Sequence, residues 1–177
     1  MSTTSTRLPK VEAVVRRICA DEGPVLKTIR LRALADAPSA FGSSYAAEFD
    51  QPHDHWTSRA EHGAAGGHSV TFFALVDGSV VGMVAAYRPD AAVPAVELVS
   101  MWVSPPQRRE GIASELAGAV LRWAHETGAA TVDLWVTRGN DPAMRLYEAA
   151  GFRLTGDHQP LPSDPSKDEL RMRRAID

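Results

Sequence analysis

The sequence contains one cysteine, Cys19, and this scarcity excludes several kinds of protein. A lone cysteine cannot form an internal disulfide, and it cannot supply the thiolate cluster of a zinc or iron centre. A reducing compartment fits such a composition best, so we expect a cytoplasmic protein. Cys19 itself is expected to be a small buried apolar residue.

Long apolar runs and blocks of like charge are missing as well. No stretch approaches the roughly 18 apolar residues that a membrane-spanning helix needs, and the polar start MSTTSTRLPK is not followed by the apolar segment of a signal peptide. The 19 basic and 22 acidic residues give a formal net charge of −3 without a basic stripe. We therefore expect neither a membrane nor a nucleic acid as a partner.

A metal site is not expected either. Four of the six histidines lie close together in the chain, namely His53, His55, His62 and His68. Their spacing matches no strong zinc pattern, and no cysteine or pair of carboxylates completes a ligand set. The prediction is that the protein binds no metal.

What the sequence does contain is an alternation of strand-like and helix-like segments. With 177 residues, 44% of them apolar, the chain can bury the core of one domain, placed at residues 11–177 after a flexible N-terminus at 1–10. Patterning predicts strands at 11–18, 70–76, 80–87, 95–103, 131–136 and 170–176, and helices from Asp21 to about Pro38 and at 43–62, 111–127 and 141–150. Turns are expected at 63–67 and 160–165, and Asp77-Gly78 predicts a hairpin.

The segment from Arg108 to Ala113 lies between a predicted strand and an amphipathic helix. Its backbone N–H groups therefore face outward at the positive end of the helix dipole, as in anion sites. Gly111 leaves room for an oxyanion to approach the backbone, and Ala113 keeps the next turn open. The segment lacks the ending of a P-loop and the three-glycine dinucleotide fingerprint, which disfavours nucleotide hydrolysis and hydride transfer. The alternative is an ordinary helix start with a glycine for the turn.

Two spaced motifs make this region more specific. Arg108-x-x-Gly111-x-Ala113 follows the strand ELVSMWV at 97–103, and NDPAMRLYEAAGF occupies 140–152. The first is similar to the pattern Arg/Gln-x-x-Gly-x-Gly/Ala, and the second to Asn-x-x-Ala-x-x-Leu-Tyr-x-x-x-Gly-Phe, of the GNAT superfamily of acetyl-CoA-dependent N-acetyltransferases. The resemblance covers nearly the whole chain and is weakest at residues 20–70.

The resemblance implies an α/β fold with a mixed, mostly antiparallel sheet that splays between its fourth and fifth strands and is flanked by about four helices. The pantetheine arm of acetyl-CoA would enter this gap along Met101 and Val103, and the diphosphate would lie on the N–H groups of 108–114. The implied cofactor-binding residues are Met101, Trp102, Val103, Arg108, Arg109, Glu110, Gly111, Ile112, Ala113, Ser114, Asn140, Ala143 and Tyr147. For Arg108 and Arg109 a solvated surface position is the alternative, and Asn140 is also suited to cap the following helix.

Amide formation requires a neutral amine, a donor for the developing oxyanion and a proton for the departing thiolate. The resemblance assigns the thiolate proton to Tyr147 and the oxyanion donor to a backbone N–H near Val103. Glu97 is the candidate general base, because a carboxylate in an apolar strand is costly to bury without a purpose. The alternatives are a packing role for Tyr147 and, for Glu97, a solvated or hydrogen-bonded strand glutamate. Phe41 is expected either in a wall of the acceptor pocket or in the core.

We therefore expect an enzyme that transfers an acetyl group from acetyl-CoA to a primary amine, a small molecule, by direct attack in a ternary complex. A protein or peptide N-terminal acetyltransferase and a non-catalytic acyl-CoA-binding module are the alternatives. Segments 38–68 and 155–168 would set the acceptor. A homodimer is expected by analogy alone.

Overall fold

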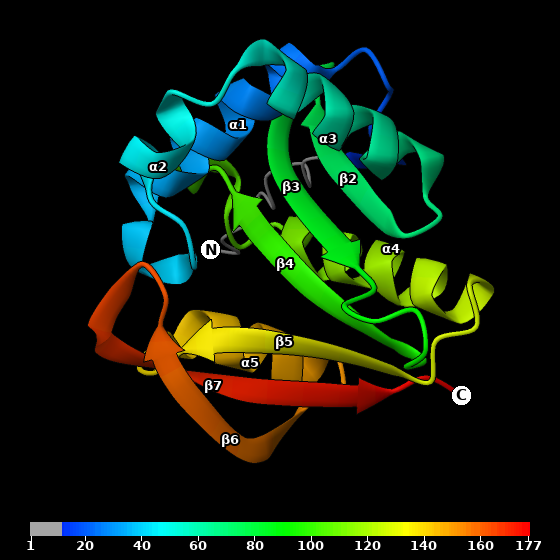
Figure 1. Cartoon of the computed structure of the whole chain (residues 1–177), viewed down its shortest axis with the longest axis vertical. Helices are drawn as coiled ribbons and strands as arrows, with labels where there is room; N and C mark the ends of the chain where they lie inside the picture. Colours follow the sequence, from blue (N-terminus) through cyan, green and yellow to red (C-terminus); the bar gives the residue numbers. More distant parts are fainter. Residues whose placement is uncertain (1–11) are drawn as a thin grey trace, which may run out of the picture.

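In the computed structural model, which describes residues 12–177, the strands form one sheet in the order β1-β2-β3-β4-β5-β7-β6 (Figure 1). They are β1 (Val14–Arg17), β2 (Ser69–Val76), β3 (Ser79–Tyr87), β4 (Ala95–Val103), β5 (Thr131–Thr137), β6 (Arg153–Leu161) and β7 (Asp164–Ala175). Neighbouring strands run antiparallel except for the parallel pair β4 and β5. The expected mostly antiparallel mixed sheet is confirmed, whereas the predicted flexible segment 1–10 lies outside the described residues.

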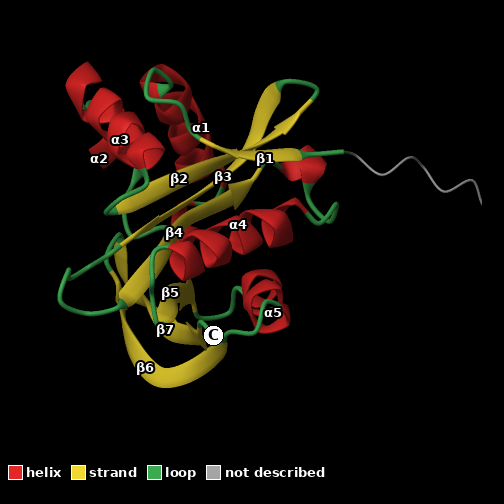
Figure 2. Ribbon diagram, turned by 90° about the vertical axis from the view of Figure 1, so that its right-hand side faces the viewer, coloured by secondary structure: helices red, strands yellow, loops and turns green. Residues whose placement is uncertain are grey.

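Helices cover both faces of the sheet (Figure 2). One face carries α1 (Gly23–Asp36), α2 (Tyr45–Phe49) and α3 (His53–Ala65), and the other carries α4 (Ile112–Glu126) and α5 (Asp141–Ala149). The predicted apolar stripe of α4 is confirmed, because Ile112, Leu116, Val120 and Trp123 are all buried against the sheet. Burying each such side chain stabilises the fold by about 1.5–3 kcal/mol. Within residues 12–177, no helix is long and apolar enough to span a lipid bilayer.

The parallel pair β4 and β5 separates soon after it begins. Its register joins Ala95 to Thr131, Val96 to Val132 and Glu97 to Asp133, after which the two strands diverge (Figure 1). The sheet therefore splays between its fourth and fifth strands, as predicted. The end of β4 is left with backbone groups that β5 does not occupy.

A bulge in β4 lies at the start of this divergence. Between the pairs Ala85–Val99 and Met83–Trp102, β3 advances by two residues and β4 by three, so β4 holds one extra residue. Ser100, inside this step, has φ +59°. The extra residue resets the alternation of side chains: Leu98 packs under α4, whereas Trp102 packs into the core under α1 and α3.

The predicted helix at 43–62 is wrong as a single element. It is two helices, α2 and α3, separated around Pro52, which is the N-cap of α3 and has an extended ψ of 161°. Proline also restrains the residue before it from helical backbone, which explains the break. The predicted turn at 63–67 begins too early, because α3 continues to Ala65 and the left-handed residue is Gly66, with φ +69°.

The predicted turn at 160–165 is present but shorter, at residues 162–163, and the last strand begins earlier than the predicted residue 170. Residues up to Leu161 belong to β6, and β7 starts at Asp164, so the two strands form a hairpin with a short connection. Pro160 is tolerated because β6 is an edge strand, where a missing N–H leaves no inner ladder bond broken. Cys19 is a further correction, since it is exposed and not buried.

Candidate active site

A cavity of about 610 Å³ opens where β4 and β5 separate. Its walls come from the end of β4, the loop and first turn of α4, the start of α5 and the segment that follows α1. The lining residues are Ala37, Ala40, Phe41, Met101, Trp102, Val103, Gln107, Arg108, Arg109, Gly111, Ile112, Ala113, Ser114, Asn140, Pro142, Ala143 and Leu146. The structure thus brings together most of the predicted cofactor residues and Phe41, while the lining does not include Glu110, Tyr147 or Glu97.

The N-terminus of α4 faces this cavity with a backbone suited to an anion. Gly111 is the N-cap, has φ +85°, and has no side chain that could accept a hydrogen bond from the first-turn N–H groups. The amide groups of the first helical turn have no partner inside the helix, so they are available to a ligand. A Cβ at Gly111 would meet no atom of residues 12–177 within 4 Å, so glycine is needed here for its left-handed backbone and for ligand access.

Arg108 is engaged by protein groups at the cavity rim. Its Nε donates to the carbonyl oxygen of Val103 at 2.9 Å, and its Nη2 donates to Asp36 at the end of α1. Trp102 Nε1 donates to the same Asp36 oxygen at 2.9 Å. The hydrogen bond from Trp102, and to a smaller extent the bond from Arg108, holds the pKa of Asp36 below its usual value. Sequence reasoning missed Asp36, whose bonds to Trp102 and Arg108 hold the end of β4 against α1. The side chain of Arg109, the other predicted arginine, is exposed.

On α5, two predicted residues occupy different environments. Asn140 caps the helix, because its side-chain oxygen accepts from the N–H of Ala143 at 3.3 Å, and it also lines the cavity. Tyr147 is 6% exposed and packs edge-to-face on Phe152, with ring centroids 5.7 Å apart. Burial raises the pKa of the Tyr147 hydroxyl, which keeps the phenol protonated.

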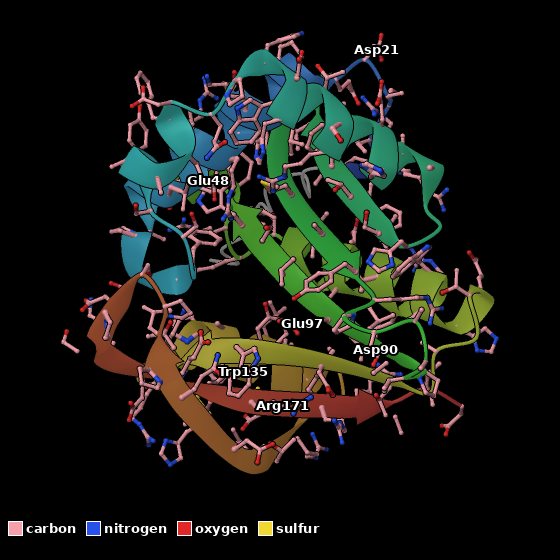
Figure 3. All side chains as sticks on the ribbon, viewed as in Figure 1. Asp21, Glu48, Asp90, Glu97, Trp135 and Arg171 are labelled. Carbon is pink, nitrogen blue, oxygen red and sulfur yellow. The ribbon has the colours of Figure 1, made fainter. Side chains whose placement is uncertain are left out.

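Glu97 lies on the face of the sheet opposite α4. Its neighbours Val96 and Leu98 belong to the core under α4, so the alternation of the strand turns Glu97 the other way. Figure 3 shows Glu97 near Trp135 and Arg171 on this face, between the α1–α3 layer and the β6–β7 hairpin. Burial raises the pKa of Glu97, hydrogen bonding with Tyr87 and the charge of Arg171 oppose the rise, and the nearby carboxylates add to it.

Three carboxylates share this open face, and only one is neutralised. Asp133 accepts from Arg171 Nη2 at 2.5 Å and from Arg173 Nε at 2.6 Å, and these bonds outweigh the effect of burial, so its pKa is lowered. Burial raises the pKa of Glu169, although Gln159 Nε2 donates to it at 2.5 Å. Neither Glu97 nor Glu169 forms an ion pair with any residue that the structure describes.

The β6–β7 hairpin is tied to the cavity wall that follows α1. Ser163 Oγ, in the hairpin turn, donates to the carbonyl oxygen of Phe41 at 2.5 Å. Lys167 Nζ donates to Ser39 Oγ at 2.6 Å, and Thr137 Oγ1 donates to the Ser39 carbonyl at 2.6 Å. The two halves of the splayed sheet are thus bridged at the open end.

Across residues 12–177, no three His, Cys, Asp or Glu side chains are grouped to hold a metal.

The sequence and the fold both have known counterparts. The family model described as the acetyltransferase (GNAT) family matches residues 31–152. Aminoglycoside N(6')-acetyltransferase type 1 of Salmonella typhimurium is 30% identical over 94 residues, which are 50% of this chain and 65% of that protein. The chain therefore spans just under two thirds of this relative's length.

Two solved structures share the fold. An acetyltransferase of the GNAT family from Streptococcus pneumoniae has a TM-score of 0.78 and 18% identity, covering 94% of this chain and all of that one (100%). A putative acetyltransferase from Salmonella typhimurium, solved with its cofactor acetyl-CoA, has a TM-score of 0.76 and 16% identity, covering 94% and 95% of the two chains. At these identities the likeness concerns the fold.

Proposed function

Since the chain belongs to the acetyltransferase (GNAT) family, we propose that it transfers the acetyl group of acetyl-CoA to a primary amine by direct attack in a ternary complex. The observation that carries the proposal is the cavity at the splay, which both sequence motifs line. In this cavity the N-terminus of α4, residues 111–114, whose N–H groups can bind an anion, lies beside the apolar end of β4 from Met101 to Val103. Such a combination suits a ligand with a diphosphate at one end and an amide-containing arm at the other.

Three groups would carry the chemistry. The amine nitrogen attacks the thioester carbonyl carbon, a backbone N–H near Val103 receives the developing oxyanion, and the C–S bond then breaks. Tyr147, a protonated phenol, gives its proton to the departing sulfur. Glu97, which like Tyr147 lies outside the cavity lining, accepts the proton that the ammonium loses through an intervening water.

For the acceptor, we propose a small cationic amine. Glu97 and the buried Glu169 lie on the same face of the sheet and form no ion pair with any residue from 12 to 177, and carboxylates without such a partner attract an ammonium ion. The β6–β7 turn is hydrogen-bonded to Phe41, which lines the cavity, and a wall tied in this way favours a compact acceptor over a protein N-terminus that threads through. Cytoplasmic location and a homodimer stay predictions from the sequence.

The deciding experiment is thiol release from acetyl-CoA measured against a panel of amines. We expect turnover with small polyamines or aminoglycosides and little with N-terminal peptides of proteins. Turnover confined to the peptides would reject the acceptor class. Tight acetyl-CoA binding without turnover on any amine would favour the non-catalytic module.

Acetyl-CoA should raise the melting temperature of the protein. A ligand that binds only the native state at one hundred times its Kd stabilises that state by about 2.7 kcal/mol, roughly 5–10 °C for a chain of this length. The measurement is a thermal melt at millimolar acetyl-CoA. ATP at the same concentration is the control, because it carries phosphates and a nucleotide without the pantetheine arm. A folded protein whose melt does not move with acetyl-CoA would contradict the proposal.

Replacing Glu97 by Gln should lower kcat/KM most in an intermediate pH window. Below the raised pKa of Glu97 the wild-type carboxyl is itself protonated and cannot accept a proton, so the two proteins converge. Above the pKa of the acceptor ammonium the amine is already neutral, and they converge again. The test is a pair of pH profiles with one amine. Glu169→Gln is the matched control, and it should lower kcat/KM by the same factor at every pH. If the profile of Glu97→Gln is likewise parallel to that of the wild type, the assignment of Glu97 as the base is rejected.

A further inference from the structure

The bulge of β4 is a strained segment at the cavity. Ser100 adopts φ +59°, a left-handed conformation that non-glycine residues seldom take. Such a conformation persists only where the surrounding structure holds it. The next residues, Met101 to Val103, line the cavity and carry the backbone groups that β5 leaves free. Whatever holds Ser100 therefore also determines where these backbone groups point.

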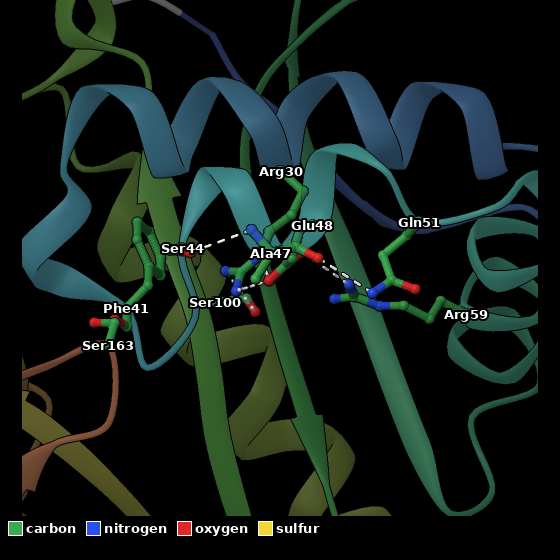
Figure 4. A network of polar contacts seen from close by, with 9 residues as sticks. All are labelled: Arg30, Phe41, Ser44, Ala47, Glu48, Gln51, Arg59, Ser100 and Ser163. Carbon is green, nitrogen blue, oxygen red and sulfur yellow. Dashed lines mark hydrogen bonds and ion pairs between the residues drawn. The ribbon is translucent and has the colours of Figure 1, made fainter.

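One buried side chain, Arg30 of α1, contacts the bulge (Figure 4). Its Nη1 donates to Ser100 Oγ at 3.3 Å, and its Nη2 donates to Glu48 of α2 at 2.7 Å. The Nε of Arg30 lies 3.1 Å from both Glu48 carboxylate oxygens. The guanidinium carbon is 4.8 Å from the ring centre of Phe41, the cavity wall. The guanidinium of Arg30 on α1 thus contacts α2, Phe41 in the cavity wall and the bulge of β4.

The pairing with Glu48 fixes the orientation of Arg30. Arg30 is 6% exposed, and a fork-to-carboxylate contact at this depth allows the planar guanidinium one orientation. Burial pushes the pKa of Glu48 up, but bonds and charge from Arg30, with help from Ser43 and Arg59, leave it below its usual value, so Glu48 stays ionised. Arg30 Nη1 is consequently held toward Ser100.

We propose that Arg30 is a positioning residue, which acts through Ser100 to hold the bulge of β4 and thereby aims the N–H groups of Met101–Val103 at the thioester carbonyl. The inference rests on the proposed function, since it requires acetyl-CoA in the cavity. Donors to a developing oxyanion act by being fixed in advance, and displacements on the order of 1 Å are costly for rate. Arg30 supplies this fixation from a neighbouring layer without touching the reacting atoms.

The test uses the carbonyl stretching frequency of bound ¹³C-labelled acetyl-CoA, which reports how strongly protein donors polarise the thioester. In the wild type this frequency should lie below that of free acetyl-CoA. Arg30→Lys, which keeps the charge but loses the fork, and Ser100→Ala should each move it back toward the free value. Their kcat should fall about 10- to 100-fold while the KM for acetyl-CoA changes far less.

The double variant and a control separate positioning from general stability. If Arg30 acts through Ser100, Arg30→Lys should add little in the Ser100→Ala background, because the shared contact is already lost. Arg59 contacts the same Glu48 carboxylate at 3.3 Å, and no bond joins it to Ser100 within residues 12–177. Arg59→Lys should therefore leave the bound carbonyl frequency at the wild-type value.

A wild-type frequency in folded Arg30→Lys that still binds acetyl-CoA would overturn the inference, and so would an equal shift in Arg59→Lys. Should Arg30→Lys fail to fold, Ser100→Ala decides: a shifted frequency supports the inference and an unshifted one overturns it. Absence of acetyl-CoA binding by the wild type would instead reject the proposed function, a distinguishable result.

Discussion

Tyr147→Phe should lower kcat by about 10² to 10⁴-fold while leaving the affinity for acetyl-CoA nearly unchanged. Phenylalanine keeps the ring and its contact with Phe152, so the change removes the hydroxyl alone. The loss is made in the transition state, when the thiolate departs, and therefore appears in kcat. The measurement is steady-state kinetics together with thermal melts in the presence of acetyl-CoA, under conditions where chemistry limits turnover.

Two controls distinguish catalysis by Tyr147 from packing. Phe152→Leu removes the partner ring and keeps the hydroxyl, so it should reduce the free energy of unfolding by about 1 kcal/mol or more and largely spare kcat. A thioester whose leaving thiol has a lower pKa should restore much of the rate of Tyr147→Phe, because that thiolate needs less protonation. Wild-type kcat in Tyr147→Phe would end its role as the acid.

Gly111→Val should abolish the stabilisation of the protein by acetyl-CoA. A side chain at φ +85° costs on the order of 1–2 kcal/mol in backbone strain, yet its Cβ would meet no atom within 4 Å in the part of the chain that the structure describes. The new side chain would instead occupy the space in front of the first-turn amides of α4, where the diphosphate is proposed to lie. Thermal melts with and without acetyl-CoA measure the effect.

Gly128→Val is the matched control for Gly111→Val. Gly128 lies beyond the other end of α4 and has φ +72°, and a Cβ there would also meet no described atom within 4 Å. The two variants therefore carry a similar backbone cost, but only one faces the cavity. Gly128→Val should melt earlier and still respond fully to acetyl-CoA. A full response in Gly111→Val would place the diphosphate elsewhere.

Local patterns predicted the elements that are defined by periodicity or by turn chemistry. The apolar spacing in α4 and the Asp77-Gly78 turn between β2 and β3 are examples, and both hold in the structure. β6 was missed because it is an exposed edge strand: six of its nine residues are exposed in an unbroken run, so no alternation of apolar and polar residues marks it. The break at Pro52 was missed although proline gives a local signal for it.

The candidate site also contains some residues that local sequence patterns predicted and others that they could not. The backbone cradle at Gly111 and the Asn140 cap follow from residue types within a few positions of each other, and both line the cavity. Arg30 and Asp36 could not be found this way, because their partners Ser100 and Trp102 lie 70 and 66 residues further along the chain. Contacts between side chains so far apart leave no pattern in a single sequence.

The extra residue in β4 makes the length of this strand as constraining as its composition. Shortening β4 by one residue at Ser100 would restore uninterrupted alternation from Val96 onward. Trp102 and Val103 would keep their present faces, toward α1 and toward α4, but the irregular backbone that precedes Met101–Val103 would be lost. One residue more or fewer without a matching change in the bulge would turn both side chains to the opposite faces. Insertions and deletions that homologous chains tolerate in loops should therefore be rare between Val99 and Val103, even where the residues themselves vary.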